Sequence, residues 1–80
     1  MINDHLVKAI VDIAMFLEFT DENLLDADAA IRAMEQLADE LQKMPADGKD
    51  VFIRCCHDLA GRYGNKRQFV ENLPEALGIG

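Results

Sequence analysis

The stretch that decides the fold runs from Asp26 to Pro45 and reads DADAAIRAMEQLADELQKMP. Its apolar residues recur three and four positions apart, which is the spacing of one face of an α-helix. We expect that face to be buried, through Ala30, Met34, Leu37, Leu41 and Met44. Asp26 is a suitable N-cap, and Pro45 ends the helix because the residue before a proline is disfavoured in the α region. The stretch therefore predicts a helix over 27–44.

Before this helix, residues 3 or 4 to 18 have helical spacing too, but with apolar residues on two sides. One side is the expected core stripe, widened by Val7 and Ala14, and consists of Leu6, Ile10, Ile13 and Leu17. A second line lies opposite, among charged residues, and consists of Val11, Met15 and Phe19. A helix that is apolar on two sides is either central in its fold or covered by a partner. Both alternatives stay open from the sequence. The connection that follows holds Leu24 and Leu25, which we expect to pin it to the core.

After Pro45, the spacing predicts a third helix from residue 46 or 47 to 63, ended by Gly64. Its inward residues are expected to be Phe52, Cys55, Cys56, Leu59 and Tyr63. A short fourth helix is predicted over 66–72, ended by Pro74, with one further turn that lays Leu77 on the core. Connections this short imply antiparallel neighbours. The sequence thus predicts an all-α fold, a compact antiparallel bundle of three longer helices and a short C-terminal one, in a single domain over 1–80.

Composition and charge limit the class of partner. Half of the 80 residues are hydrophobic, which is typical of a folded chain. Ten of the 15 acidic residues fall in residues 1–44 against three bases, so the formal net charge of −7 belongs to the first half. Direct binding to nucleic acid is disfavoured because it requires net Lys and Arg, whereas an acidic surface favours a basic protein partner.

No apolar run approaches the ~20 residues of a membrane span. Without a recognisable signal peptide and with two adjacent free cysteines, we expect a cytoplasmic protein.

Two clusters could carry chemistry. The acidic residues of the connection do not match a calcium-binding loop, because Ala30 or Leu25 stands where a ligand is needed and Ile31 stands where the turn glycine belongs. These acidic residues are Glu18, Asp21, Glu22, Asp26 and Asp28. The run Cys55-Cys56-His57-Asp58 suggests metal or thiol chemistry, but consecutive helical residues diverge around the axis and cannot converge on one ion. We interpret the cysteines as small buried hydrophobes. No catalytic residue, metal ligand or cofactor is predicted.

Two runs carry a resemblance: Phe16 to Leu41, with FLEFTDEN, DADAA and LADEL, and Phe69 to Gly78, FVENLPEALG. They resemble small bacterial proteins of similar length. In size, acidity and helical make-up the chain is also similar to the small immunity proteins that bacteria pair with secreted toxins. That resemblance implies a helical inhibitor without enzymatic activity. It carries over no site residues, because Tyr63 is the sole tyrosine and the tyrosine-rich motif of colicin-type immunity helices is absent.

The leading hypothesis is a non-enzymatic module that binds and neutralises a basic protein such as a toxin. Buried apolar anchors supply affinity and peripheral charge sets specificity. The expected partner-binding residues combine the second apolar line with the acidic connection: Val11, Met15, Glu18, Phe19, Asp21, Glu22, Asp26 and Asp28. The alternative is a structural homodimer or oligomer in which the same apolar line pairs across a two-fold axis.

Overall fold

The computed structural model describes residues 4–80, and this part of the chain contains helices and no strand. The helices are α1 (Asp4–Phe19), α2 (Ala27–Gln42), α3 (Ala46–Leu59), the 3-10 helix η1 (Ala60–Lys66) and α4 (Arg67–Ala76). The all-α prediction is confirmed. The predicted bounds of the first two helices are correct to within two residues, and the third helix, with η1 counted as its end, extends three residues beyond the predicted end at residue 63.

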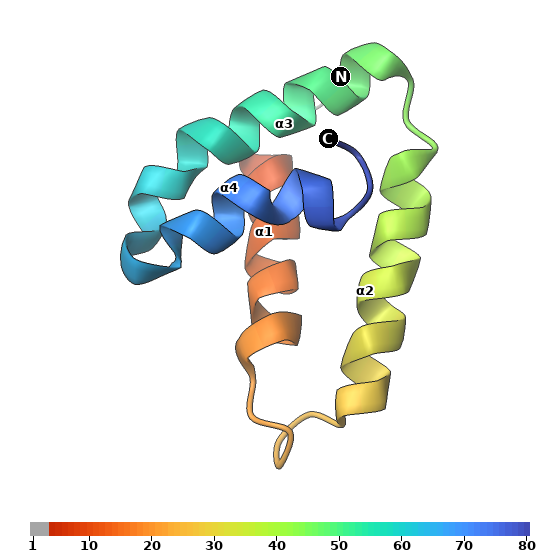
Figure 1. Ribbon diagram of the computed structural model, residues 1–80, viewed down its shortest axis with the longest axis vertical. Helices are drawn as coiled ribbons and strands as arrows, with labels where there is room; N and C mark the ends of the chain where they lie inside the picture. Colours follow the sequence, from red (N-terminus) through yellow and green to blue (C-terminus); the bar gives the residue numbers. More distant parts are fainter. Residues whose placement is uncertain (1–3) are drawn as a thin grey trace.

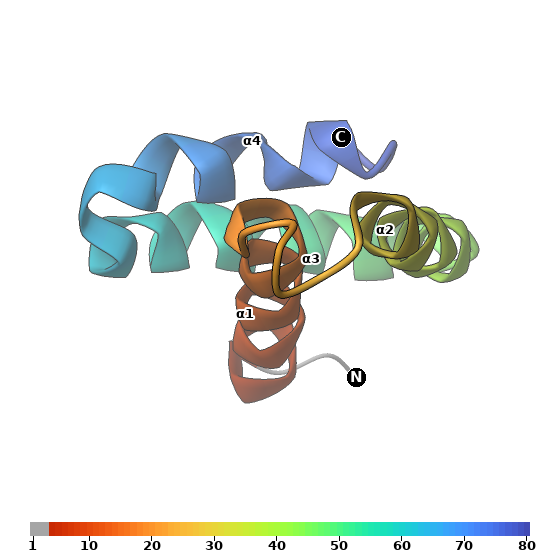
Figure 2. The same ribbon diagram turned by 90° about the horizontal axis from the view of Figure 1, so that it is seen from below.

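Two antiparallel pairs make up the bundle (Figure 1). The first pair is α1 and α2, joined by a loop at the lower end of the molecule, and we call it the α1–α2 hairpin. The second pair is α3 and α4, joined through η1, and it lies across the upper part of the first pair. Seen from below, α1 crosses α3 and α4 at a steep angle while α2 lies to one side (Figure 2). The lower part of the α1–α2 hairpin therefore extends beyond the cover of α3 and α4.

The core lies where the two pairs cross. Its largest fully buried side chains are Phe52 and Leu73, and Leu77 is also buried as predicted. The remaining buried residues are Val7, Val11, Ala14, Leu41, Cys56, Leu59, Ala60, Val70 and Pro74. On α2 only Leu41 is buried, and the other members of the predicted stripe are half-buried. This helix consequently covers one side of the core instead of passing through it.

The buried face of α1 corrects the sequence prediction. Val7, Val11 and Ala14 are fully buried, whereas Leu6 is 50% and Ile13 55% exposed. The predicted core stripe was therefore wrong at Leu6 and Ile13, although Ile10 and Leu17 are half-buried. Periodicity could not choose between two apolar sides. The structure places the side with the smaller residues inward, because small and β-branched side chains let crossing helices approach closely.

The end of α4 also differs from the prediction. Pro74 is buried inside the helix and does not end it. The helix ends after Ala76, where Gly78 has a φ of +77° and the amide of Ile79 donates to the Pro74 carbonyl at 2.8 Å. These are features of the Schellman motif, which needs a residue that tolerates positive φ. Burial of Pro74 and Leu77 outweighs the one helical hydrogen bond that a proline cannot donate. By contrast, Asp26 caps α2 as predicted, accepting from the Ala29 amide at 3.0 Å.

Candidate partner-binding surface

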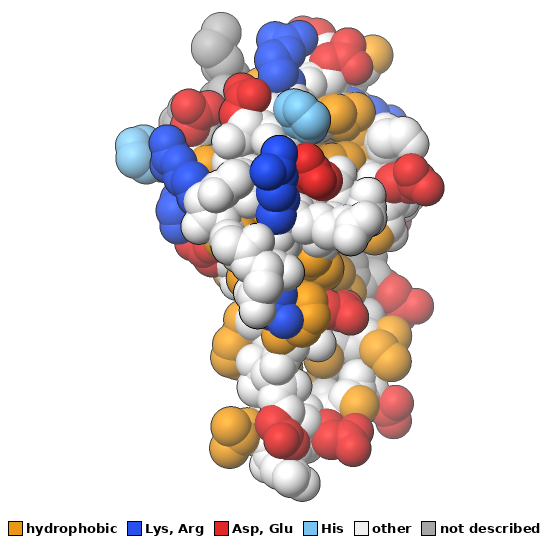
Figure 3. All heavy atoms as spheres, turned by 60° about the vertical axis from the view of Figure 1, so that its left-hand side comes forward, with side chains coloured by type: hydrophobic (Ala, Val, Ile, Leu, Met, Phe, Trp, Pro, Cys, Tyr) orange, Lys and Arg blue, Asp and Glu red, His pale blue; other side chains and the backbone are white. Residues whose placement is uncertain are grey.

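Large apolar side chains gather on the outside of the α1–α2 hairpin. Among the described residues, all of the exposed large hydrophobic side chains belong to this hairpin: Leu6, Ile13, Phe16, Phe19, Leu24 and Ile31. Single exposed hydrophobic residues are ordinary, but a cluster on one element indicates an interaction surface. In the lowest part of Figure 3 the coloured side chains are hydrophobic or acidic, whereas Lys, Arg and His lie higher, mainly over α3, η1 and α4.

A groove of about 630 Å³ lies on the hairpin, between the lower part of α1, α2 and the turn after α4. Most of its lining is apolar: Leu17, Leu25, Ala27, Ala30, Ile31, Met34, Ala38, Ala76 and Leu77. The charged residues of its lining are Glu18, Glu22 and Glu35. Within the described chain, neither Lys nor Arg lines it. The groove thus joins an apolar floor to a rim of one sign of charge.

The acidic connection below the groove is ordered by its own carboxylates. Asp21 accepts a 2.8 Å hydrogen bond from the Asn23 amide, which is a turn-forming contact. Asp26 accepts from the Ala29 amide at the start of α2. Asp21, Asp26 and Asp28 all remain exposed. Their local bonds account for the turn, and their charge still extends the negative surface at the hairpin end.

The predicted apolar line does not form a continuous outer surface. Val11 is fully buried and belongs to the core, so its assignment to an exposed surface was wrong. Met15 is half-buried and packs against the core. Phe19 is 45% exposed, with its ring edge-on to Phe69 at 5.0 Å between centroids and the Lys66 ammonium 3.8 Å above it. The predicted acidic residues, Glu18, Asp21, Glu22, Asp26 and Asp28, are all exposed.

Sequence reasoning missed several residues of this surface. Ile13 was assigned to the core, and Leu24 was expected to pin the loop although it is 84% exposed. Ile31 carried a usable signal, since it lies three residues after Asp28 and four before Glu35, on the polar side of α2. A large apolar residue among charges on a helix is the pattern that could have identified it.

The cysteines are unsuited to nucleophilic chemistry. Burial raises the pKa of the Cys56 thiol to about 12. The pKa of Cys55 is also raised, by desolvation and by the 3.3 Å hydrogen bond that its thiol donates to Asp4 Oδ1. Since the thiolate is the reactive form, both side chains remain in the unreactive state near neutral pH. Their role as packing residues is consistent with the prediction.

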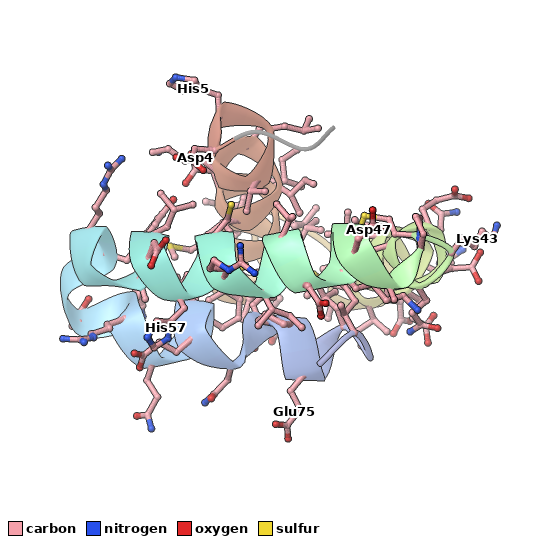
Figure 4. The ribbon with its side chains drawn as sticks, turned by 90° about the horizontal axis from the view of Figure 1, so that it is seen from above. Asp4, His5, Lys43, Asp47, His57 and Glu75 are labelled. Carbon is pink, nitrogen blue, oxygen red and sulfur yellow. The ribbon has the colours of Figure 1, made fainter. Side chains whose placement is uncertain are left out.

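Other titratable side chains do not converge. His5 and His57 point outward from different helices, and Glu75 lies apart from both (Figure 4). In residues 4–80, no group of three or more His, Cys, Asp or Glu side chains has an arrangement suited to a metal ion. Among the basic side chains near this end of α1, Lys66 lies over Phe19, and Arg67 on α4 pairs with Glu71 at 3.5 Å. None of the described helices combines the length and apolarity needed to cross a membrane.

Comparisons of the chain with protein-family models, curated proteins and solved structures found no match. The groove and its acidic rim are therefore the observations on which a functional proposal rests.

Proposed function

We propose that this protein is a non-enzymatic binding module that captures a basic segment of another protein in the acid-rimmed groove of the α1–α2 hairpin. The observation that supports the proposal is the combination found there: an apolar floor between two helices and a rim of Glu18, Glu22 and Glu35. An apolar groove between helices is suited to the apolar face of an amphipathic helix. Carboxylates at its edge favour Lys and Arg on the flanks of that helix.

The charge distribution supports the same class of partner. The formal net charge of −7 is concentrated in residues 1–44, which include the whole hairpin. A field of one sign attracts an oppositely charged partner and raises its association rate. Within the hairpin, Lys8 and Lys43 are engaged with neighbouring carboxylates, Asp12 at 2.9 Å and Asp39 at 3.3 Å respectively. Arg32, the remaining base of the hairpin, does not line the groove.

The biological role we propose is immunity-like: the module neutralises its partner by covering a basic surface. Proteins that act on nucleic acids expose Lys and Arg to contact phosphates. An acidic module seated on such a surface competes directly with the nucleic acid. A toxin of this class is the partner that best suits both the groove and the charge of the hairpin.

A designed peptide tests the groove directly. The probe is a fluorescein-labelled amphipathic helix with Leu at positions i, i+3, i+4 and i+7 and Lys elsewhere. The matched peptide has Glu in place of every Lys. Fluorescence anisotropy should show binding of the Lys peptide, weakened by salt, and no binding of the Glu peptide. If the Lys peptide does not bind at low salt, the groove is not a site for basic helices.

Charge reversal then separates the contribution of the groove to peptide binding from that of the protein's net charge. We expect the double variant Glu22→Lys with Glu35→Lys to weaken binding at least about tenfold, because both residues line the groove. The matched control is Asp50→Lys with Asp58→Lys, which changes the net charge equally at exposed positions on α3. The control should weaken binding far less. Equal weakening by both variants would show that only net charge attracts the peptide.

A further inference from the structure

The solvent side of α1 carries a second apolar surface, distinct from the groove. Ala9, Ile13 and Phe16 follow one another at spacings of four and three, and all are exposed. We call these three residues the outer seam. They lie on the opposite side of α1 from Val7 and Val11, which face the core. The helix therefore presents one apolar stripe inward and another outward.

The spacing of the outer seam is that of helix pairing. Alternating steps of three and four place residues at the a and d positions of a heptad, along the line where two helices meet. Leu6 occupies the preceding position of the same series. The large residues Ile13 and Phe16 are 55% and 56% exposed, and the small Ala9 beside them leaves room for a side chain from a facing helix. A second helix is thus the partner that this surface fits by shape.

The exposed area is also larger than expected for a compact monomer. A monomeric protein of 8.9 kDa typically exposes about 4,800 Å². This chain exposes 5390 Å². The surplus of roughly 600 Å² approaches the ~800 Å² that each partner contributes to a standard interface. The chain thus exposes more surface than expected for its mass, and Ile13 and Phe16 contribute to this exposed surface.

The charge around the outer seam permits a second copy of the chain there. The charged residues of the central turns of α1 are Lys8 and Asp12, and they pair with each other at 2.9 Å. The seam consequently has no net charge to repel itself. The acidic residues of the hairpin end, such as Asp21 and Glu22, lie beyond the C-terminal end of the helix.

We infer that two copies of this chain associate through the outer seam, with their α1 helices antiparallel across a two-fold axis. Antiparallel pairing puts the two acidic hairpin ends at opposite ends of the interface. The 16 residues of α1 span about 24 Å, well beyond the ~8 Å over which salt screens charge. The outer seam of one copy then contacts the outer seam of the other, so that the two-fold dimer is closed and leaves no seam free for a third copy. This dimer does not depend on the groove being a binding site.

Molar mass in solution tests the dimer. Light scattering over a concentration series should give twice the chain mass at micromolar concentrations. Because the seam is apolar, the dimer should persist when salt is raised from about 0.05 M to about 0.5 M. A molar mass equal to that of a single chain at every concentration would overturn the inference. A dimer that dissociates at high salt would also overturn it, because such a contact would be electrostatic.

Two matched substitutions locate the contact. Ile13→Gln with Phe16→Gln should raise the dimer dissociation constant at least about 30-fold, since each substitution removes an apolar anchor from both copies. The control is Ile31→Gln, which changes a similarly exposed isoleucine, 57%, that lines the groove. Ile31→Gln should leave the dimer intact. If it weakens the dimer as much as the seam variant, the interface lies elsewhere on the hairpin.

The same variants separate this inference from the proposed function. The seam variant should still bind the Lys peptide, while Ile31→Gln should bind it less well. Circular dichroism checks that each variant remains helical. If the seam variant loses its fold, Ala9→Gln provides the second test, because a bulkier side chain at this exposed position should hinder close approach of the facing helix. A dimer unaffected by Ala9→Gln would contradict the inferred seam.

Discussion

The Tyr63 hydroxyl donates a 2.6 Å hydrogen bond to Asp12 Oδ1 and so joins η1 to the middle of α1. The other carboxylate oxygen of Asp12 pairs with Lys8 at 2.9 Å. The Tyr63 hydrogen bond, followed by that from Lys8, lowers the pKa of Asp12. Burial and the bond to Asp12 raise the pKa of Tyr63. The Tyr63–Asp12 hydrogen bond is thus one of the polar contacts that connect the two helix pairs.

Removing this hydroxyl should weaken the link between the pairs. We expect Tyr63→Phe to lower the free energy of unfolding by about 1 kcal/mol, the usual net value of one hydrogen bond. Urea denaturation followed by circular dichroism measures the difference. Arg62→Ala at the neighbouring exposed position is the control and should have little effect. An unchanged midpoint for Tyr63→Phe would mean that water replaces the bond without loss.

The same contact predicts a pH dependence. Because the folded-state pKa of Asp12 is lowered, its contribution to stability is present above the ordinary Asp pKa of about 3.9 and is lost as pH falls through the lowered value. For Tyr63 the pKa is raised, so its contribution is present below about pH 10 and is lost as pH rises through the raised value. In Tyr63→Phe the carboxyl pKa of Asp12 should move up towards its ordinary value. An NMR titration of the carboxyl carbon reports this shift, and an unmoved pKa would contradict the assigned cause.

The corrected orientation of α1 can be checked with two truncations. Val11→Ala removes methyl groups from a fully buried site and should cost about 1–3 kcal/mol. Ile13→Ala removes a larger part of a half-exposed side chain and should cost less than about 1 kcal/mol in the monomer. Both are measured by urea denaturation at the lowest usable protein concentration, so that self-association does not contribute. A larger loss of stability for Ile13→Ala than for Val11→Ala would instead support the sequence-based assignment of Ile13 to the core.

The end of α4 depends on a glycine. Gly78 has positive φ, and a Cβ there would come within 2.5 Å of the Gln42 side-chain nitrogen. That nitrogen donates to the Leu77 carbonyl at 2.8 Å, so the added methyl would also disturb the bond between α2 and the C-terminal turn. We expect Gly78→Ala to destabilise the protein by about 1–2 kcal/mol. Gly61→Ala is the matched control, because a Cβ there would meet no neighbouring side chain within 4 Å and its φ is not positive. It should be neutral or slightly stabilising, as judged by thermal denaturation.

Thiol labelling should distinguish the two cysteines. In Cys55→Ser, the remaining Cys56 is fully buried with a pKa of about 12, so it should react with iodoacetamide only when the core opens. In Cys56→Ala, the half-buried Cys55 should react faster under the same native conditions. Mass spectrometry over time gives both rates, and sub-denaturing urea should accelerate Cys56 more. Equal native rates would show that Cys56 is more accessible than its position in the core implies.

The elements of the fold were predictable because their signals are local. The cap at Asp26, the stop before Pro45 and the positive φ of Gly64 each follow from the chemistry of one or two residues. The side of α1 that faces inward was not predictable, because Val11 and Ile13 belong to equally plausible apolar stripes. Only the crossing with α3 decides between them. Pro74 was misjudged for the same reason, since burial in the core overrides its local tendency to end a helix.

The candidate surface was predicted in part. Its acidic residues follow from counting charge along the chain, and Glu18 and Glu22 do line the groove. Glu35 and Ile31 were missed because they come from a different helix, and their proximity to the loop depends on how α1 and α2 pack. Leu24 was misassigned because composition cannot tell whether a loop leucine turns inward or outward.

The pairing of helices that are neighbours in the chain has a kinetic consequence. Packing of α1 on α2, and of α3 through η1 on α4, closes only short loops, whereas the contact between α1 and α3 joins distant segments. Helical proteins dominated by local contacts fold in microseconds to milliseconds. We therefore expect the α1–α2 hairpin and the α3–α4 pair to form early. The contact between these two pairs, with the Tyr63–Asp12 hydrogen bond, should form last. Such rapid folding shortens the time for which unprotected apolar side chains are open to aggregation.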